Sequence, residues 1–221
     1  MKRLLLASMS FMLGGQFVAF AAEAASYNPV GPQTNVSAST VTGGGWAECY
    51  RDLYSFQTLD PNTVLSACQG DQLMLACRVT GSATLTLLAQ GNRADVTFDT
   101  GDNADQLHSA NGVGWYFNQS GTDSWGFVRD GDTVAKNNCD VDGSGANDQR
   151  LCWHLNPPNG GYRCGVTEGL NDSSAWERIV YVSRVNVAAA IPTLSQWGLI
   201  LLAVLAAAGA WFGFTRQRRA A

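Results

Sequence analysis

Aromatic residues that could hold a sugar ring recur in the middle of the sequence. They are set among aspartate, asparagine and glycine, and they are Trp115, Tyr116, Trp125, Trp153 and Trp176. Sugar rings stack on aromatic faces while neighbouring polar groups hydrogen-bond to their hydroxyls. The pattern therefore predicts a carbohydrate-binding surface with a polysaccharide as partner. The alternative is that these side chains fill the core of a β domain.

An acidic run between two cysteines is the best candidate for a metal site. Its oxygen-bearing side chains are Asp140, Asp142, Ser144 and Asp148, a spacing that resembles the calcium loops of EF-hand and dockerin proteins. Position 12 of the run is Leu151, where an EF-hand has a bidentate glutamate. The run therefore predicts either a calcium site or a glycine-rich hairpin loop without metal. A second acidic patch, residues 99–105, is a weaker calcium candidate.

Signals for catalysis are sparse. Nucleophilic catalysis needs a base beside the nucleophile, and neither His108 nor His154 lies in a known catalytic signature. The segment 121–126 is one residue too long for a nucleophile elbow. The acidic residues could include a glycosidase pair, although no pair stands out. We therefore expect no catalytic residues, and an extracellular hydrolase remains the alternative.

The cysteines indicate an oxidising compartment. There are six, an even number, and all lie in the middle of the chain: Cys49, Cys68, Cys77, Cys139, Cys152 and Cys164. No C-x-x-C spacing occurs and only two histidines are present, which argues against zinc. We expect up to three disulfides, whose pairing the sequence alone does not choose among 15 possibilities.

Charge is distributed unevenly along the 221 residues. The whole chain has a net charge of −4, but residues 26–190 hold 9 basic and 17 acidic residues, a net of −8. Phosphate binding requires a basic surface, so nucleic acid is not expected as a partner.

The N-terminal segment has the features of a secretory signal. Lys2 and Arg3 precede an apolar stretch that continues to Phe20, and two A-x-A sequences follow. This order predicts a signal peptide over residues 1–25 with cleavage between about Ala21 and Ala25. The protein is therefore expected to be exported across the inner membrane.

The C-terminal segment predicts a membrane helix. Residues 197–214 are an unbroken apolar stretch of 18, which as a helix reaches roughly 27 Å, enough for a bilayer core. Arg216, Arg218 and Arg219 follow at once and should stay cytoplasmic. The protein is thus expected to be membrane-anchored, with its middle outside.

A short motif stands directly before this helix. Its fixed positions are Ile191, Pro192, Thr193, Leu194, Trp197 and Gly198. With the apolar helix and the arginine-rich end, it resembles the IPTL-CTERM sorting signal, a relative of the PEP-CTERM signals. The resemblance covers residues 191–221 and implies an exosortase-type membrane protease or transpeptidase as partner. It also implies delivery to the cell envelope, the surface or the extracellular matrix after processing.

The middle of the chain predicts one all-β domain, a disulfide-containing sandwich or barrel over residues 46–185. Short β-type segments alternate with glycine, aspartate and asparagine turns about every ten residues. The expected strands are Leu73–Val79, Thr84–Ala89, Ala94–Phe98, Val113–Asn118, Ser124–Arg129, Leu151–Leu155, Gly161–Val166 and Arg178–Val185. Short helices are expected at Ala47–Leu53 or Ala175–Ile179, a flexible lead-in at residues 26–45 and a linker at 186–190.

Three functions are consistent with this organisation. The spacing of Cys68, Gly70, Leu73, Leu75 and Cys77 resembles the opening of rhamnose-binding-type lectin domains. A surface-binding or adhesion module is therefore the first hypothesis. The hydrolase and a purely structural envelope protein are the alternatives.

Overall fold

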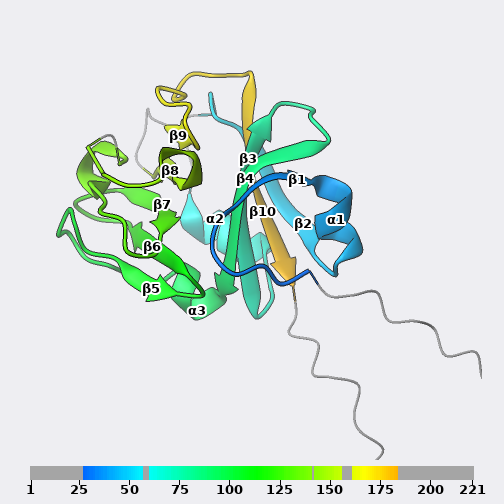
Figure 1. Ribbon diagram of the computed structural model, residues 1–221, viewed down its shortest axis with the longest axis horizontal. Helices are drawn as coiled ribbons and strands as arrows, with labels where there is room; N and C mark the ends of the chain where they lie inside the picture. Colours follow the sequence, from blue (N-terminus) through cyan, green and yellow to red (C-terminus); the bar gives the residue numbers. More distant parts are fainter. Residues whose placement is uncertain (1–26, 57–59, 141, 156–160, 184–221) are drawn as a thin grey trace, which may run out of the picture.

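The computed structural model describes residues 27–56, 60–140, 142–155 and 161–183. These residues form two antiparallel sheets of five strands each, which face each other across a shared core (Figure 1). The prediction of a disulfide-containing all-β domain is confirmed, and the arrangement is a sandwich. No helix in these four ranges is long and apolar enough to span a bilayer. The expected signal peptide and the expected span at 197–214 lie outside the described residues.

Sheet A has the spatial order β1-β4-β3-β10-β2. Its strands are β1 (Gln33–Ser37), β2 (Ala47–Leu53), β3 (Gln72–Val79), β4 (Thr84–Asn92) and β10 (Trp176–Ser183). The last strand, β10, pairs with both β3 and β2, so it lies inside the sheet. Its central residues, 177–181, are buried, which suits a strand covered on both faces.

Sheet B is a simple meander between β4 and β10 in the sequence. Its strands are β5 (His108–Ala110), β6 (Val113–Asn118), β7 (Ser124–Arg129), β8 (Leu151–His154) and β9 (Arg163–Cys164). Alternate residues of β6, β7 and β8 enter the inter-sheet core. The residues between them pack against Val134 and Cys139 from the loop that follows β7. Both faces of the centre of this sheet are therefore buried.

Short helices lie between the strands in the sequence. They are α1 (Ala38–Gly43), α2 (Pro61–Ala67), α3 (Arg93–Val96), η1 (Lys136–Asn138) and η2 (Asn147–Gln149). Val41 of α1 packs with Met74, Ile179 and Tyr181 on the outer face of sheet A. Asp60 caps α2 by accepting hydrogen bonds from the backbone of Asn62 and Thr63.

Three local predictions are wrong. The expected helix at Ala47–Leu53 is strand β2, and the expected helix at Ala175–Ile179 lies largely in strand β10, because pairing between β2 and β10 outweighs local preference. The expected strand at Ala94–Phe98 is instead mostly the single turn α3. The described part of the expected flexible lead-in contains β1 and α1, and β1 is paired with β4.

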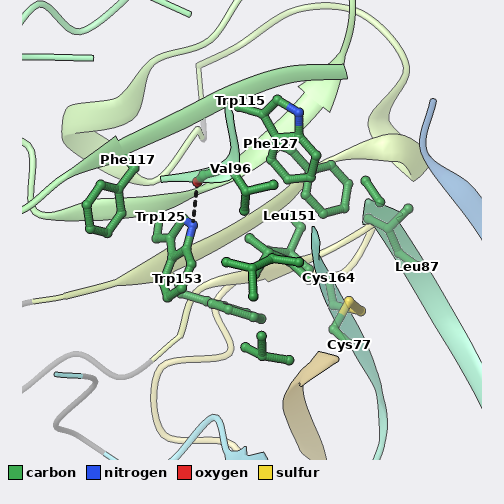
Figure 2. Close-up of a cluster of buried hydrophobic side chains, with 14 of the residues drawn as sticks. Cys77, Leu87, Val96, Trp115, Phe117, Trp125, Phe127, Leu151, Trp153 and Cys164 are labelled. Carbon is green, nitrogen blue, oxygen red and sulfur yellow. Dashed lines mark hydrogen bonds between the residues drawn. A yellow bond between two sulfur atoms is a disulfide. The ribbon is translucent and has the colours of Figure 1, made fainter. Parts of the chain in front are cut away.

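Three disulfides connect the six cysteines, as expected. The pairs are Cys49–Cys68, Cys77–Cys164 and Cys139–Cys152. Cys77 belongs to β3 and Cys164 to β9, so this bond links the two sheets through the core (Figure 2). The other two bonds close segments of 19 and 13 residues, one beside the inter-sheet core and one on the outer face of sheet B.

Candidate functional site

Four of the five aromatic residues expected to bind a sugar lie in the interior. Trp115, Tyr116, Trp125 and Trp153 are fully buried. Figure 2 shows the three tryptophans stacked into the core with Phe117 and Phe127. Trp125 and Trp153 pack edge to face with ring centroids 5.8 Å apart, an arrangement typical of core aromatics. The prediction that these four form a carbohydrate surface is wrong.

The indole N–H groups of two of these tryptophans donate hydrogen bonds to other residues of the interior. Trp125 Nε1 donates to the carbonyl of Val96 at 3.1 Å, and Trp153 Nε1 donates to Tyr54 Oη at 3.1 Å. Only Trp176, at the start of β10, is partly accessible among the five. A single half-buried tryptophan does not make the platform that the sequence suggested.

The acidic run at 140–148 is organised around an arginine. Asp140 is fully buried, and its Oδ2 accepts from Arg150 Nη1 at 2.6 Å. Arg150 also donates to the carbonyls of Thr133 and Ser144. A guanidinium with several oxygen partners therefore occupies the position for which the sequence suggested calcium.

The other expected calcium ligands point to local partners or to solvent. Asp142 accepts from the Asn138 amide, the Ser144 hydroxyl lies 2.8 Å from that of Thr133, and Asp148 is exposed. Within the described ranges, no three acidic, histidine or cysteine side chains form a cluster suited to a metal. Asp140, Asp142 and Ser144 are therefore engaged by groups of the same region of the chain.

The weaker acidic patch at 99–105 holds a lysine in the same way. Lys136 is fully buried, and its Nζ donates to Thr100 O at 3.2 Å, Thr100 Oγ1 at 2.9 Å and Gly101 O at 2.9 Å. Burial lowers the pKa of this ammonium group, while the nearby Asp99, Asp102 and Asp105 oppose that shift. In each acidic segment, a buried cationic side chain of the same chain donates to the oxygens.

An open groove of about 390 Å³ is the candidate ligand site on the surface. Its lining residues are Tyr50, Asp52, Phe56, Asp60, Thr63 and Val64. All six lie between Cys49 and Cys68, so one disulfide closes the segment that builds the groove. A volume of this size lies within the range of roughly 300–1,000 Å³ that is usual for small-molecule sites.

The groove combines an exposed aromatic ring with fixed carboxylates. Phe56 is 52% exposed, although it is a large apolar residue. Asp52 accepts from Tyr50 Oη at 3.3 Å and from the Leu53 amide at 2.8 Å. Hydrogen bonds from Thr63 and Asn62 lower the pKa of the Asp60 carboxyl, so this group is ionised near neutral pH.

A buried arginine supports the floor of the groove. Arg178 of β10 is fully buried, and its Nη2 donates to the carbonyl of Phe56 at 2.8 Å. This bond holds the backbone of Phe56 while the ring stays accessible. Burial raises the pKa of the Tyr50 hydroxyl, which keeps it protonated and able to donate.

Sequence reasoning missed this groove because part of it lies in the expected helix at 47–53. The sequence signal that marks it is the pair Cys49 and Cys68, which encloses three aromatic and two acidic residues. Elsewhere, His108 Nε2 lies 2.8 Å from Asp95 Oδ1, and the imidazole stacks on Phe98. His154 lies in β8 against Tyr162.

The expected sorting residues, from Ile191 to Arg219, lie outside the described residues. Strand β10 ends at Ser183, eight positions before Ile191. A family model described as the IPTL-CTERM motif matches residues 189–219. The chain carries an IPTL-CTERM motif. This confirms the resemblance drawn from Ile191, Pro192 and the residues after them.

The IPTL-CTERM motif supports a C-terminal sorting signal for exosortase-type processing and suggests membrane-linked processing toward the cell surface. It covers the tail of the chain and not the β-sandwich. No curated protein and no solved structure matches the chain. The lectin-like resemblance at Cys68–Cys77 therefore has no support from these comparisons. The function of the sandwich has to be argued from its own residues.

Proposed function

We propose that this protein is exported and then processed at the cell envelope by an exosortase-type enzyme that acts at Ile191–Gly198. The match to the IPTL-CTERM motif carries the proposal. The β-sandwich is the cargo, and its three disulfides suit an oxidising compartment. Proline disfavours a helical backbone at the residue before it, so the sequence Ile191–Pro192 suits a protease cleft that accepts an extended chain.

The processing step is tested by mass spectrometry of the protein recovered from an exosortase-containing host. The expected product has lost the signal peptide and the arginine-rich end. Replacing Pro192 or Leu194 with alanine should leave the precursor uncut. Ser195→Ala is the matched control because position 195 is not fixed in the motif. A mature protein that still ends with Arg218 and Arg219 would overturn the proposal.

We also propose that the Cys49–Cys68 groove is the surface by which the sandwich binds a saccharide. The exposed Phe56 ring offers a stacking face, and Asp52 and Asp60 offer acceptors for hydroxyl groups. This moves the carbohydrate hypothesis from buried tryptophans to an accessible site. A hydrolase on the same scaffold remains the alternative, because two carboxylates border the groove.

A glycan array probed with the detergent-solubilised full chain tests the groove. Binding should fall about two- to tenfold in Phe56→Ala, since contact with one aromatic ring contributes about 0.5–1.5 kcal/mol beyond the buried area. Phe98→Ala is the matched control, because Phe98 is a similarly exposed phenylalanine outside the groove. Equal losses in both variants would contradict the assignment. Turnover of a bound glycan would favour the hydrolase.

A further inference from the structure

The hydroxyl groups that line the Cys49–Cys68 groove are already used as donors. Tyr50 Oη donates to Asp52 Oδ2 at 3.3 Å, and Thr63 Oγ1 donates to Asp60 Oδ2 at 2.6 Å. The remaining two lining side chains are apolar. Among the described lining residues, no side-chain N–H or O–H is therefore left to donate to a ligand.

Backbone amides of the groove are used within the chain as well. Phe56 N donates to the carbonyl of Leu53 at 3.1 Å. Thr63 N donates to Asp60 Oδ2 at 3.2 Å, and Val64 N donates to the carbonyl of Asp60 at 3.2 Å. A carboxylate, a sulfate or an amide carbonyl needs a donor from its site, and these groups have none to give.

The two carboxylates, in contrast, can still accept. Described residues donate two hydrogen bonds to Asp52 and three to Asp60, whereas a carboxylate has about four lone-pair sites. Asp60 is exposed and Asp52 is half-buried, so a ligand in the groove can reach both side chains. The groove therefore selects for a ligand that donates hydrogen bonds.

Charge at the groove is also one-sided. Its two carboxylates are offset by one guanidinium, that of Arg178, which is fully buried beneath the groove and not accessible to a ligand. The exposed Arg51 is adjacent in sequence, but its guanidinium pairs with Glu48 at 2.7 Å. One negative charge thus remains among these groups. The acidic composition of residues 26–190, with 17 acidic and 9 basic residues, adds to it.

We propose that the saccharide bound in this groove is a cationic amino sugar, with an amine that is not acetylated. The inference rests on the saccharide function proposed above. An ammonium group has three donors, no acceptor and one positive charge, which complements Asp52 and Asp60, while the sugar ring packs on the exposed Phe56. An N-acetyl group lacks the charge and adds a carbonyl that needs a donor. A uronic acid adds a carboxylate that the groove repels.

Titration of the detergent-solubilised full chain with matched disaccharides tests the proposal. The probes are the glucosamine disaccharide, its N-acetylated form and a disaccharide that contains glucuronate, at a mildly acidic pH that keeps the amines protonated. NMR shifts or calorimetry should show the glucosamine form binding about fivefold or more tighter than the N-acetylated form, because charge-assisted hydrogen bonds are the stronger ones. The glucuronate probe should not bind. Equal binding of the first two, or equally tight binding of a lysine dipeptide, would overturn the amino-sugar assignment.

Variants of the carboxylates locate the preference. Asp60→Asn removes the charge at constant size, and α2 should still form because asparagine also caps helices. Asp52→Asn is the second variant. In each, the preference for the amine over the acetamide should fall to about twofold or less. Asp105→Asn is the control, because Asp105 is exposed and does not line the groove. An equal loss in the control would assign the preference to overall charge and overturn the site.

Phe56→Ala separates this inference from the saccharide function itself. The variant should weaken the glucosamine and N-acetylated disaccharides alike, by about two- to tenfold, and leave the ratio of their affinities unchanged. Binding that depends on Phe56 but is equal for amine and acetamide would overturn the amino-sugar inference alone. If no glycan binds in a Phe56-dependent way, the saccharide function fails together with it.

Discussion

At the scale of single residues, Lys136 and Arg150 order the two acidic loops of the domain. Lys136 Nζ meets three oxygens of Thr100 and Gly101, and Arg150 holds Asp140 together with the carbonyls of Thr133 and Ser144. Each cation is fully buried, so its removal leaves acceptors without water or protein donors. Such losses are larger than those of surface ion pairs.

We expect Lys136→Met to lower the free energy of unfolding by about 2–4 kcal/mol, because three buried acceptors lose their donor. Arg129→Met is the comparison, since Arg129 is exposed and pairs with Asp132 at 2.9 Å. Its expected cost is below about 1 kcal/mol. Denaturant unfolding measures both. Similar costs for the two variants would show that the Lys136 contacts do not order the loop.

His154 makes the stability depend on pH. Burial lowers the pKa of its imidazole below the ordinary 6.5, so the unfolded chain binds a proton more readily than the folded one. The free energy of unfolding is therefore unaffected by this group above pH 6.5. It decreases as the pH falls from 6.5 to the lowered pKa. His154→Gln should flatten the curve of melting temperature against pH in this window. An unchanged slope would contradict the assignment.

At the scale of elements, the Cys77–Cys164 bond joins strands of different sheets, β3 and β9. Its residues are 87 positions apart, whereas Cys139 and Cys152 are 13 apart. A longer closed loop removes more entropy from the unfolded chain. The bond between the sheets should therefore contribute more to stability than the bond that closes the outer loop.

Replacing both cysteines of the Cys77–Cys164 pair with alanine should destabilise the protein by about 4–5 kcal/mol. The same replacement of Cys139 and Cys152 should cost about 3 kcal/mol. All four residues are fully buried, which makes the two double variants comparable. Thermal unfolding under oxidising conditions measures the difference. A larger cost for the Cys139 and Cys152 replacement would show that local packing, and not loop length, determines how much each disulfide stabilises the protein.

The elements also show where sequence reasoning succeeds. Strands β6 and β7 have the predicted bounds Val113–Asn118 and Ser124–Arg129, because glycine-rich turns and β-type residues agree there. The helix predicted at Ala47–Leu53 is wrong. Alanine, glutamate and leucine favour a helix there, but β10 provides a strand that pairs with this segment. Local pattern contains no information about such a distant strand.

The candidate sites were harder to predict than the strands. Tryptophans among polar residues indicate a binding surface only if one face of their sheet is exposed, and both faces of sheet B are buried at its centre. The groove depends on contacts such as the bond from Arg178 to the carbonyl of Phe56. These two residues are 122 positions apart in the sequence, so local spacing could not indicate the groove.

At the scale of the whole molecule, the first and last described residues of the domain lie at the same end of the sandwich. Tyr27 accepts a hydrogen bond from Trp46, and the adjacent Ala47 pairs with Val182 near the end of β10 (Figure 1). The eight positions from Ser183 to Ile191 span at most about 29 Å. If an exosortase-type enzyme acts at the motif as proposed, it acts within this distance of the sandwich.

Deleting residues 186–190 should slow processing, because the sandwich would then obstruct a protease that acts at the membrane. Inserting five glycine and serine residues there should leave processing unchanged, since flexible linkers cost little. The processed fraction is measured by mass spectrometry at fixed times after synthesis. Equal processing of the shortened and lengthened chains would mean that the enzyme needs no clearance from the domain.

The position of β10 has a consequence for the order of events during export. A chain that is threaded through the inner membrane from its N-terminus delivers β2 and β3 early, and β10 only after the whole of sheet B. Until β10 arrives, the facing edges of β2 and β3 have no partner from this chain, and unpaired edges invite aggregation. The residues that follow β10 are those of the tail. A tail held in the bilayer would thus keep the nascent domain tethered while its last, interior strand inserts, and cleavage would be productive only after that insertion.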